Sequence, residues 1–198
     1  DVYVNLDHVS FMKRSYMTRN TLKNNTTINV NVWKASQNKK CNEIYVNFEN
    51  NYIPKFLKTL ENLYSKESHY KTILNEIILP EFIDRKITIS KFNLNLIKRI
   101  CNYLDIKTKI IDTSENLTKL KKGEGLKEIT KHFNSKSYIN AIGGQSLYNK
   151  EDFKNDNIQL NFIEMGNIVF DNKYTSILDL LFRYNKEYIK EEITKYKL

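Results

Sequence analysis

The stretch SYINAIGGQSLY, residues 137–148, decides the fold class of this chain. It reads as a strand that runs into two adjacent glycines, Gly143 and Gly144, and then into a polar turn with an aromatic residue. A helical pattern precedes it, and the polar segment 149–157 after it is also expected to be helical. Strands that alternate with helices are typical of α/β folds with a largely parallel sheet.

The same alternation extends outward along the chain. Apolar and polar residues alternate, or short apolar runs occur, in segments expected to be strands: 2–6, 27–33, 43–48, 108–112, 138–142 and 158–163. The loop between the second and third of these segments predicts a β-hairpin near the N-terminus. Helical spacing is found after Pro54, over 70–78, from a cap at Ser90, after Gly123 and Gly125, and from about Ser176. We therefore expect an α/β fold in which helices cover a mostly parallel sheet.

Composition favours one globular domain. The 198 residues are 40% hydrophobic and 12% aromatic, which predicts a packed core and a single domain over 1–198. No run of about 18 apolar residues exists, and the first residues lack the order of a signal peptide, so a cytoplasmic protein without a membrane span is expected. Cys41 and Cys101 lie far apart with no metal-ligand spacing around them, which predicts reduced thiols and no metal site.

The net charge of +9 leaves two interpretations open. A basic chain is typical of nucleic-acid-binding proteins, but here the lysines are spread along the sequence and interleaved with glutamates near the end. The same charge would also serve a small substrate that carries phosphate. Nucleic acid is therefore the lesser expectation.

In open α/β sheets ligands bind at the carboxyl ends of the strands, which directs attention to three polar loops. These are 7–14, 112–116 and 143–148. Gly143 and Gly144 make either a tight turn or a close backbone approach to a phosphate or carboxylate.

Charged groups gather in the first loop. Asp7 and His8 follow a strand directly, where a catalytic pair can lie, although a lone histidine is more often a surface residue. Lys13, Arg14 and Arg19 form a compact basic segment with Asn20, which is either a solvated turn or an anion clamp.

Two blocks of residues resemble a known family. The first is DVYVNLDHVSFMKRSYMTRNTL, residues 1–22, which carries an ordered set of family positions: Asp7, Val9, Phe11, Lys13, Tyr16, Arg19 and Asn20. The second runs over 122–164 around the double glycine and continues in TSILDLLFRYN at 175–185. Both are similar to the WbqC-like protein family, over most of the chain. His8 and Ser10 stand where the family often has an acidic residue and a glutamine, and the sequence is expected to begin after the family's Gln-Pro-x-Tyr-x-Pro segment, so that an N-terminal strand and helix would be missing.

The resemblance implies a fold and an activity. Family members lie mostly in bacterial gene clusters for O-antigen, capsule and related surface sugars, and they are regarded as transferases that modify an amino sugar, for example by glycyl or other acyl transfer. The expected fold is a Rossmann-like three-layer sandwich with helices on both faces of the sheet. The implied partners are an activated or nucleotide-linked amino sugar and an acyl or aminoacyl donor, while any cofactor and the oligomeric state are left open.

These expectations assign roles to residues at the carboxyl edge. Asp7, His8 and Lys13 are the predicted catalytic groups, with Asp7 or His8 as general base. The predicted substrate-binding groups are Arg14, Arg19, Asn20, Ser114, Asn140, Gly143, Gly144, Gln145 and Tyr148. Two alternatives remain, a nucleic-acid-binding module and a non-catalytic partner of polysaccharide enzymes.

Overall fold

The chain divides into two compact units, each described here by itself. The structure, a computed structural model, describes residues 1–114, 116–120, 122–166 and 175–198. Of these, unit 1 contains 1–112 and 175–190, and unit 2 contains the rest, 113–166 and 191–198. The prediction of a single domain over 1–198 stays a prediction.

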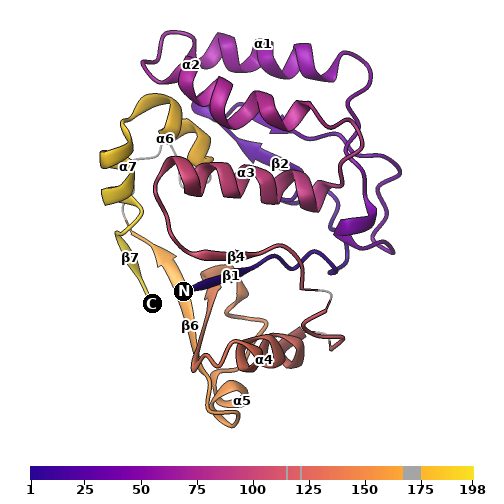
Figure 1. Ribbon diagram of the computed structural model, residues 1–198, viewed down its shortest axis with the longest axis vertical. Coiled ribbons are helices and arrows are strands. Elements are labelled where there is room, and N and C mark those ends of the chain that lie inside the picture. Colours follow the sequence, from indigo (N-terminus) through magenta and orange to yellow (C-terminus); the bar gives the residue numbers. More distant parts are fainter. Residues whose placement is uncertain (115, 121, 167–174) are drawn as a thin grey trace. The chain divides into compact units, whose positions relative to one another are not determined.

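Unit 1 holds two small sheets and most of the helices (Figure 1). Its strands are β1 (Val2–Val4), β2 (Arg19–Thr21), β3 (Thr27–Asn29) and β4 (Lys109–Ile111). Its helices are α1 (Tyr52–Tyr64), α2 (Tyr70–Ile73), α3 (Ile89–Tyr103), α6 (Ile177–Arg183) and the start of α7 (Lys186–Glu192). Short helical turns complete it: η1 (Lys23–Asn25), η2 (Cys41–Glu43), the π-helical η3 (Leu74–Ile78) and η4 (Leu79–Phe82).

Strands β1 and β4 pair in parallel, with Val2 opposite Lys109 and Val4 opposite Ile111. Parallel strands end at the same edge, so the residues that follow β1 and β4 lie close together. Asn5 illustrates this, because its side-chain amide donates a hydrogen bond to the backbone oxygen of Asp112 at 3.0 Å.

The β-hairpin near the N-terminus lies earlier in the chain than the sequence predicts. Strands β2 and β3 pair antiparallel around η1, whereas the segment 43–48 forms no regular strand. One antiparallel bridge, between Val32 and Val46, is what remains of the predicted pairing of 27–33 with 43–48. Residues 41–43 form η2 instead, which shortens the extended segment.

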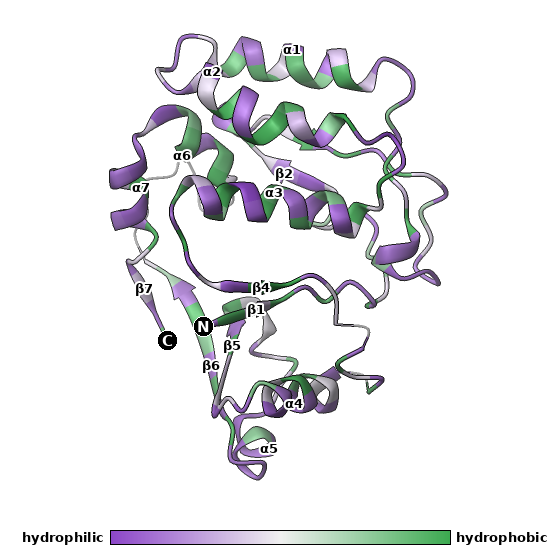
Figure 2. Cartoon of the chain, in the orientation of Figure 1, coloured by the Kyte–Doolittle hydropathy of each residue, from purple (hydrophilic) through white to green (hydrophobic). Residues whose placement is uncertain are grey.

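Helices α1 and α3 follow the predicted helical spacing, and Figure 2 shows hydrophobic and hydrophilic residues alternating along both. Pro54 lies in the first turn of α1, where a missing N–H costs nothing. The cap of α3 is Thr88 rather than Ser90, because the Thr88 hydroxyl accepts a hydrogen bond from the backbone of Lys91. Ser90 lies inside the helix, and its hydroxyl accepts a bond from Asn5 at 3.1 Å.

Unit 2 is built around a three-stranded sheet. Its elements are α4 (Lys122–His132), β5 (Ser137–Ala141), η5 (Ile142–Gly144), α5 (Lys150–Lys154), β6 (Gln159–Met165) and β7 (Tyr196–Lys197). Strand β6 pairs in parallel with β5 and antiparallel with β7. The core of the unit consists of apolar side chains from both helices and β6: Leu126, Ile129, Phe153, Ile158, Leu160 and Phe162.

The mixed α/β class predicted from the sequence is confirmed. Among the described residues, however, the strands form small sheets of two or three strands each. The Rossmann-like three-layer sandwich therefore stays a prediction. Gly123 and Gly125, expected before a helix, lie in the first turn of α4 itself.

Candidate functional site

A pocket lies directly after the double glycine, beyond the carboxyl end of β5. This pocket, called the β5 hollow below, is open to solvent, measures about 680 Å³ and is lined by Gln145, Ser146, Leu147, Tyr148, Asn149, Lys150, Glu151, Asp152 and Phe162. All of these residues belong to unit 2. The volume is within the usual range of small-molecule sites.

Gly143 and Gly144 form a helical turn and do not use the left-handed backbone region. Both lie in η5, and no described glycine has a positive φ. A β-carbon at Gly143 would meet no atom within 4 Å, whereas one at Gly144 would come 2.7 Å from the Asn140 side-chain nitrogen. Of the two open interpretations, a turn that needs positive φ is therefore excluded. The absence of a side chain at Gly144 leaves room for the Asn140 side chain, and at Gly143 it leaves the backbone exposed to solvent.

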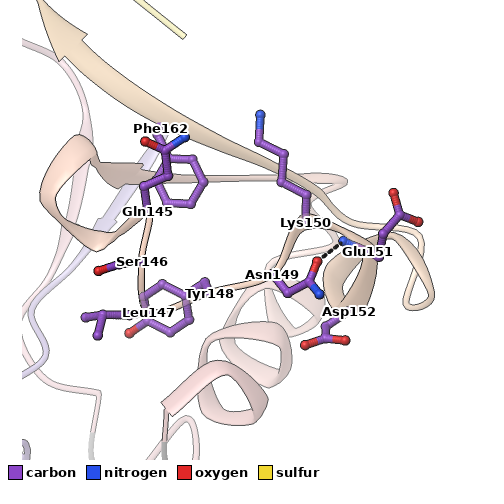
Figure 3. A pocket seen from close by; sticks show the side chains of 9 residues that line it. All are labelled: Gln145, Ser146, Leu147, Tyr148, Asn149, Lys150, Glu151, Asp152 and Phe162. Carbon is purple, nitrogen blue, oxygen red and sulfur yellow. Dashed lines mark hydrogen bonds between the residues drawn. The ribbon is translucent and has the colours of Figure 1, made fainter.

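Polar and charged groups surround the β5 hollow (Figure 3). The Lys150 ammonium lies 5.8 Å from the centre of the Phe162 ring, which faces the hollow from β6. Asn149 caps α5, because its side-chain oxygen accepts a hydrogen bond from the backbone of Glu151 at 2.9 Å. Glu151 and Asp152 add two carboxylates to the lining, and their side chains point in different directions from α5 (Figure 3).

Sequence reasoning missed Asn149, Lys150, Glu151, Asp152 and Phe162 as lining residues. The sequence placed the first four of these residues in a polar helical segment, 149–157, and Phe162 in the strand 158–163. The only sequence signal for the three charged residues is their position shortly after Tyr148. Phe162 comes from β6, so only the pairing of β5 with β6 brings it to the hollow.

Other predicted binding residues of unit 2 lie in or beside this region. Gln145 and Tyr148 line the hollow, and the Tyr148 ring packs edge-on against Phe153 at 6.2 Å. Asn140, at the end of β5, accepts a hydrogen bond from the backbone of Ala141. Ser114 is fully buried, so its side chain has no access to a solvent-exposed ligand.

The predicted catalytic residues lie in unit 1. Asp7 is buried and accepts a 3.4 Å hydrogen bond from the Asn42 side chain, while His8 is half-buried. Asp7 also affects Cys41. Burial, followed by the negative charge of Asp7, raises the pKa of the Cys41 thiol, which keeps it protonated and unreactive.

The basic segment of unit 1 is exposed. Lys13, Arg14 and Arg19 are all exposed, and Arg14 has a positive φ of 57°. Arg19 begins β2, and Asn20 pairs with Ile28 across the hairpin. The side chains of Arg19 and Asn20 therefore point to opposite sides of β2, since successive residues of a strand alternate in direction.

A second polar cluster lies where β1 and β4 end. Asp112 accepts hydrogen bonds from Lys98 and, at 3.1 Å, from Lys91, and both lysines come from α3. These contacts, with that of Lys98 first, lower the pKa of the Asp112 carboxyl. The sequence singled out the loop that starts at Asp112 but not its two lysine partners.

The twelve predicted site residues therefore fall into two sets of six, one in each unit. A single site made from both sets stays a prediction. Within the described ranges, no group of three or more histidine, cysteine or acidic side chains is arranged to hold a metal ion. No described helix has the length and apolar character needed to cross a membrane.

The fold and the β5 hollow define a mixed α/β protein with an open, polar, ligand-sized pocket beside a parallel strand pair. A family model matches residues 1–191, and the chain belongs to the WbqC-like protein family. No curated protein and no solved structure matches it significantly.

Proposed function

We propose that this protein is a transferase that modifies an amino sugar during the assembly of a bacterial surface polysaccharide. The acceptor would be an activated or nucleotide-linked amino sugar, and the donor an acyl or aminoacyl compound. Membership of the WbqC-like family supports the class of pathway. The single structural observation that carries the proposal is the β5 hollow, with its mixture of amide, hydroxyl and charged side chains.

The lining of the β5 hollow suits a hydroxylated ligand. Gln145, Ser146 and Asn149 offer both donors and acceptors to sugar hydroxyls. Lys150 offers a cation to a phosphate or carboxylate group. The exposed backbone at Gly143 leaves space for a ligand to approach β5 closely.

Acyl transfer onto an amino sugar requires a base. The amine nitrogen forms a bond to the acyl carbon, the bond to the donor's leaving group breaks with its electron pair, and the amine loses a proton. Asp152 is an exposed carboxylate of the hollow that can accept this proton. Asp7 and His8 remain the bases predicted from the sequence, and Lys13 remains a predicted catalytic group in unit 1.

Thermal stabilisation by ligands tests the proposal. A panel of nucleotide-linked amino sugars should contain a member that raises the melting temperature of the full chain, because a ligand that binds only the folded state stabilises it by mass action. At 100 times the dissociation constant the gain is about 2.7 kcal/mol. Lys150→Ala should remove most of this shift.

A matched control is available on the same short helix. Lys154 is exposed and does not line the hollow, and its 3.7 Å ion pair with Glu151 is also exposed. Lys154→Ala should therefore keep the full ligand shift. If no member of the panel stabilises the chain, or if both alanine variants respond alike, the proposed site is wrong. If the protein retains RNA or DNA on a filter at low salt, the nucleic-acid alternative is favoured instead.

Gly143→Val adds a second test. The β-carbon would enter open space, so folding should be unaffected. If a ligand approaches the backbone that follows β5, the valine side chain should obstruct it. We expect normal melting without ligand and a loss of the ligand-induced shift. Unchanged ligand response in this variant would contradict a role for the double glycine.

A further inference from the structure

Unit 1 contains a second pocket whose character differs from that of the β5 hollow. This pocket, called the α3 pocket below, measures about 310 Å³. Most of its lining side chains are apolar: Met17, Ile28, Val30, Phe56, Ile78, Phe82, Phe92, Leu96, Ile97, Ile100, Ile177 and Leu178. The described polar residues in its lining are Tyr16, Thr18, Arg19, Asn20, Asn93 and Ser176. Its volume is at the lower end of the range for small-molecule sites.

The α3 pocket lies along an apolar face of α3 that the described part of the chain covers only partly. The spacing of α3 predicts that Leu94, Ile97, Ile100 and Leu104 all face the core. Leu94 and Leu104 are each 1% exposed, as expected. Ile97 and Ile100 are only half-buried, and both line the pocket. Among the described residues, this apolar surface is therefore not fully covered by packed side chains, and a ligand that covers it would gain by its burial.

An aromatic cluster makes one wall of the α3 pocket rigid. The Phe82 ring packs edge-on against Phe56 at 5.6 Å and lies 6.3 Å from the ring of Phe92. Phe82 and Phe92 are themselves buried, so their positions are held by the core of unit 1. A wall of this kind is preformed and loses little conformational freedom when a ligand binds.

Two asparagines supply the specific polar groups. The Asn93 side-chain nitrogen donates to the backbone oxygen of Met17 at 2.9 Å, and the Asn20 side-chain oxygen accepts from the backbone of Thr21 at 2.8 Å. Within the described residues, this leaves the Asn93 oxygen as an acceptor and the Asn20 nitrogen as a donor. A carboxamide has the complementary pair, an N–H donor and a carbonyl acceptor.

The charges of the lining favour an uncharged ligand. Arg19 is the one charged residue among the described lining residues, and its side chain is exposed. Its neighbours Thr18 and Asn20 occupy the alternate strand positions, and Val30 and Ile28 lie opposite them. Strand alternation therefore predicts that the Arg19 side chain points away from these residues, so that Arg19 borders the pocket mainly through its backbone.

We propose that the α3 pocket binds a small, uncharged carboxamide with a hydrocarbon chain. The chain lies against the aromatic wall and the open face of α3, and the amide group meets Asn20 and Asn93. None of the described residues lines both this pocket and the β5 hollow. The inference goes beyond the proposed transferase activity and does not depend on it, since binding is measured without turnover.

Titration calorimetry with straight-chain primary amides, from butanamide to octanamide, tests the proposal on the full chain. Each added methylene should strengthen binding about fourfold until the pocket is full, after which affinity should level off. An absence of heat for all members, or an affinity independent of chain length, would overturn the proposal.

Ligand analogues test the amide without altering the protein. 2-Heptanone keeps the carbonyl and the hydrocarbon chain of hexanamide but has a methyl group in place of the NH2 group, so it cannot donate to Asn93. We expect it to bind at least fivefold more weakly, because a buried acceptor would lose its partner. Hexanoate should also bind more weakly than hexanamide. Tighter binding of hexanoate would show that an anion is preferred and would overturn the assignment.

A pair of tryptophan variants on α3 locates the binding site. Ile97→Trp places a large side chain in the pocket and should weaken hexanamide binding more than tenfold. Asn102→Trp makes a similar change at an exposed position of the same helix outside the pocket and should leave binding unchanged. Equal binding to both folded variants would contradict the location. If Ile97→Trp does not fold, the dependence on chain length and amide group still decides the proposal.

Discussion

At the residue scale, Asp179 on α6 is an acidic residue of unit 1 whose side chain is fully buried. It accepts a hydrogen bond from the Tyr64 hydroxyl at 2.8 Å and pairs with Arg183 at 2.9 Å. The Tyr64 oxygen in turn accepts a bond from the backbone of Lys23. Burial raises the pKa of the Tyr64 hydroxyl, so it remains a donor throughout the physiological range. This network joins α1, α6 and the hairpin through a charge that would be costly to bury alone.

Removing the Tyr64 hydroxyl should therefore destabilise unit 1. Tyr64→Phe leaves Asp179 and the Lys23 backbone each without one hydrogen bond, and we expect a loss of about 1–3 kcal/mol in the free energy of unfolding. Urea denaturation followed by Trp33 fluorescence measures it. Tyr45→Phe, at an exposed side chain, is the control and should change stability by less than about 0.5 kcal/mol. Equal effects of the two changes would show that the hydroxyl contributes nothing.

For the two glycines in the first turn of α4, we expect substitution by alanine to have opposite effects on the stability of unit 2. A β-carbon at Gly125 would lie 2.6 Å from the backbone oxygen of Leu120, whereas one at Gly123 would make ordinary contacts at 3.7 Å. Gly123→Ala should stabilise unit 2 by up to about 1 kcal/mol through helix propensity. Gly125→Ala should destabilise it, because backbone must shift. Circular dichroism during thermal unfolding compares the two variants, and a gain in stability for Gly125→Ala would contradict this account.

At the scale of elements, α3 is attached to the β1–β4 pair by charged groups. Lys91 and Lys98 both reach Asp112, which follows β4, and Asn5, which follows β1, donates to the Asp112 backbone. The Asn5 contact joins residues 107 positions apart in the sequence, whereas the two lysine contacts are much more local. Together these contacts explain why the carboxyl ends of two short strands are held together with so little sheet.

The Asp112 cluster predicts a pH dependence. Because the pKa of Asp112 is lowered in the folded state, its stabilising contribution is present above about pH 4 and is lost as pH falls through the lowered value. The side chain is 47% exposed, so the contribution should be below about 1 kcal/mol. Asp112→Asn should therefore reduce stability at pH 7 but not at pH 2 in urea titrations.

Glu49→Gln is a suitable control for this pH dependence, since Glu49 is exposed and forms no ion pair among the described residues. Its stability profile should follow that of the unaltered chain between pH 2 and pH 7. A profile of Asp112→Asn that parallels the original chain throughout would show that the lysine contacts do not stabilise the fold.

At the scale of the whole molecule, the two units each have a core of their own. Compact units of this kind can unfold as separate cooperative bodies. The protein's single tryptophan, Trp33, lies in unit 1 and reports on that unit alone. Unit 2 can be followed through the amides of β5 and β6.

Hydrogen exchange measured by mass spectrometry tests this independence. Gly125→Ala should increase exchange in 122–165 while exchange in α1 and the Trp33 unfolding transition stay unchanged. Tyr64→Phe should have the converse effect. If either substitution accelerates exchange equally in both units, the chain unfolds as one cooperative body and the prediction of a single domain gains support.

The sequence by itself determined the type of most elements and the family. Helical or alternating spacing located α1, α3, β1, β4, β5 and β6, because local periodicity records which side of an element is apolar. It also singled out the double glycine and three of the loops that follow strands.

Only the tertiary structure decided what those apolar sides meet. The pairing of β1 with β4, the lysines around Asp112, the arrival of Phe162 at the β5 hollow and the open face of α3 all join segments far apart in sequence. A periodic pattern predicts that Ile97 faces inward, but not whether packed side chains or a pocket lie opposite. What lies opposite Ile97 depends on the packing of segments far apart in the sequence, and local spacing carries no information about that packing.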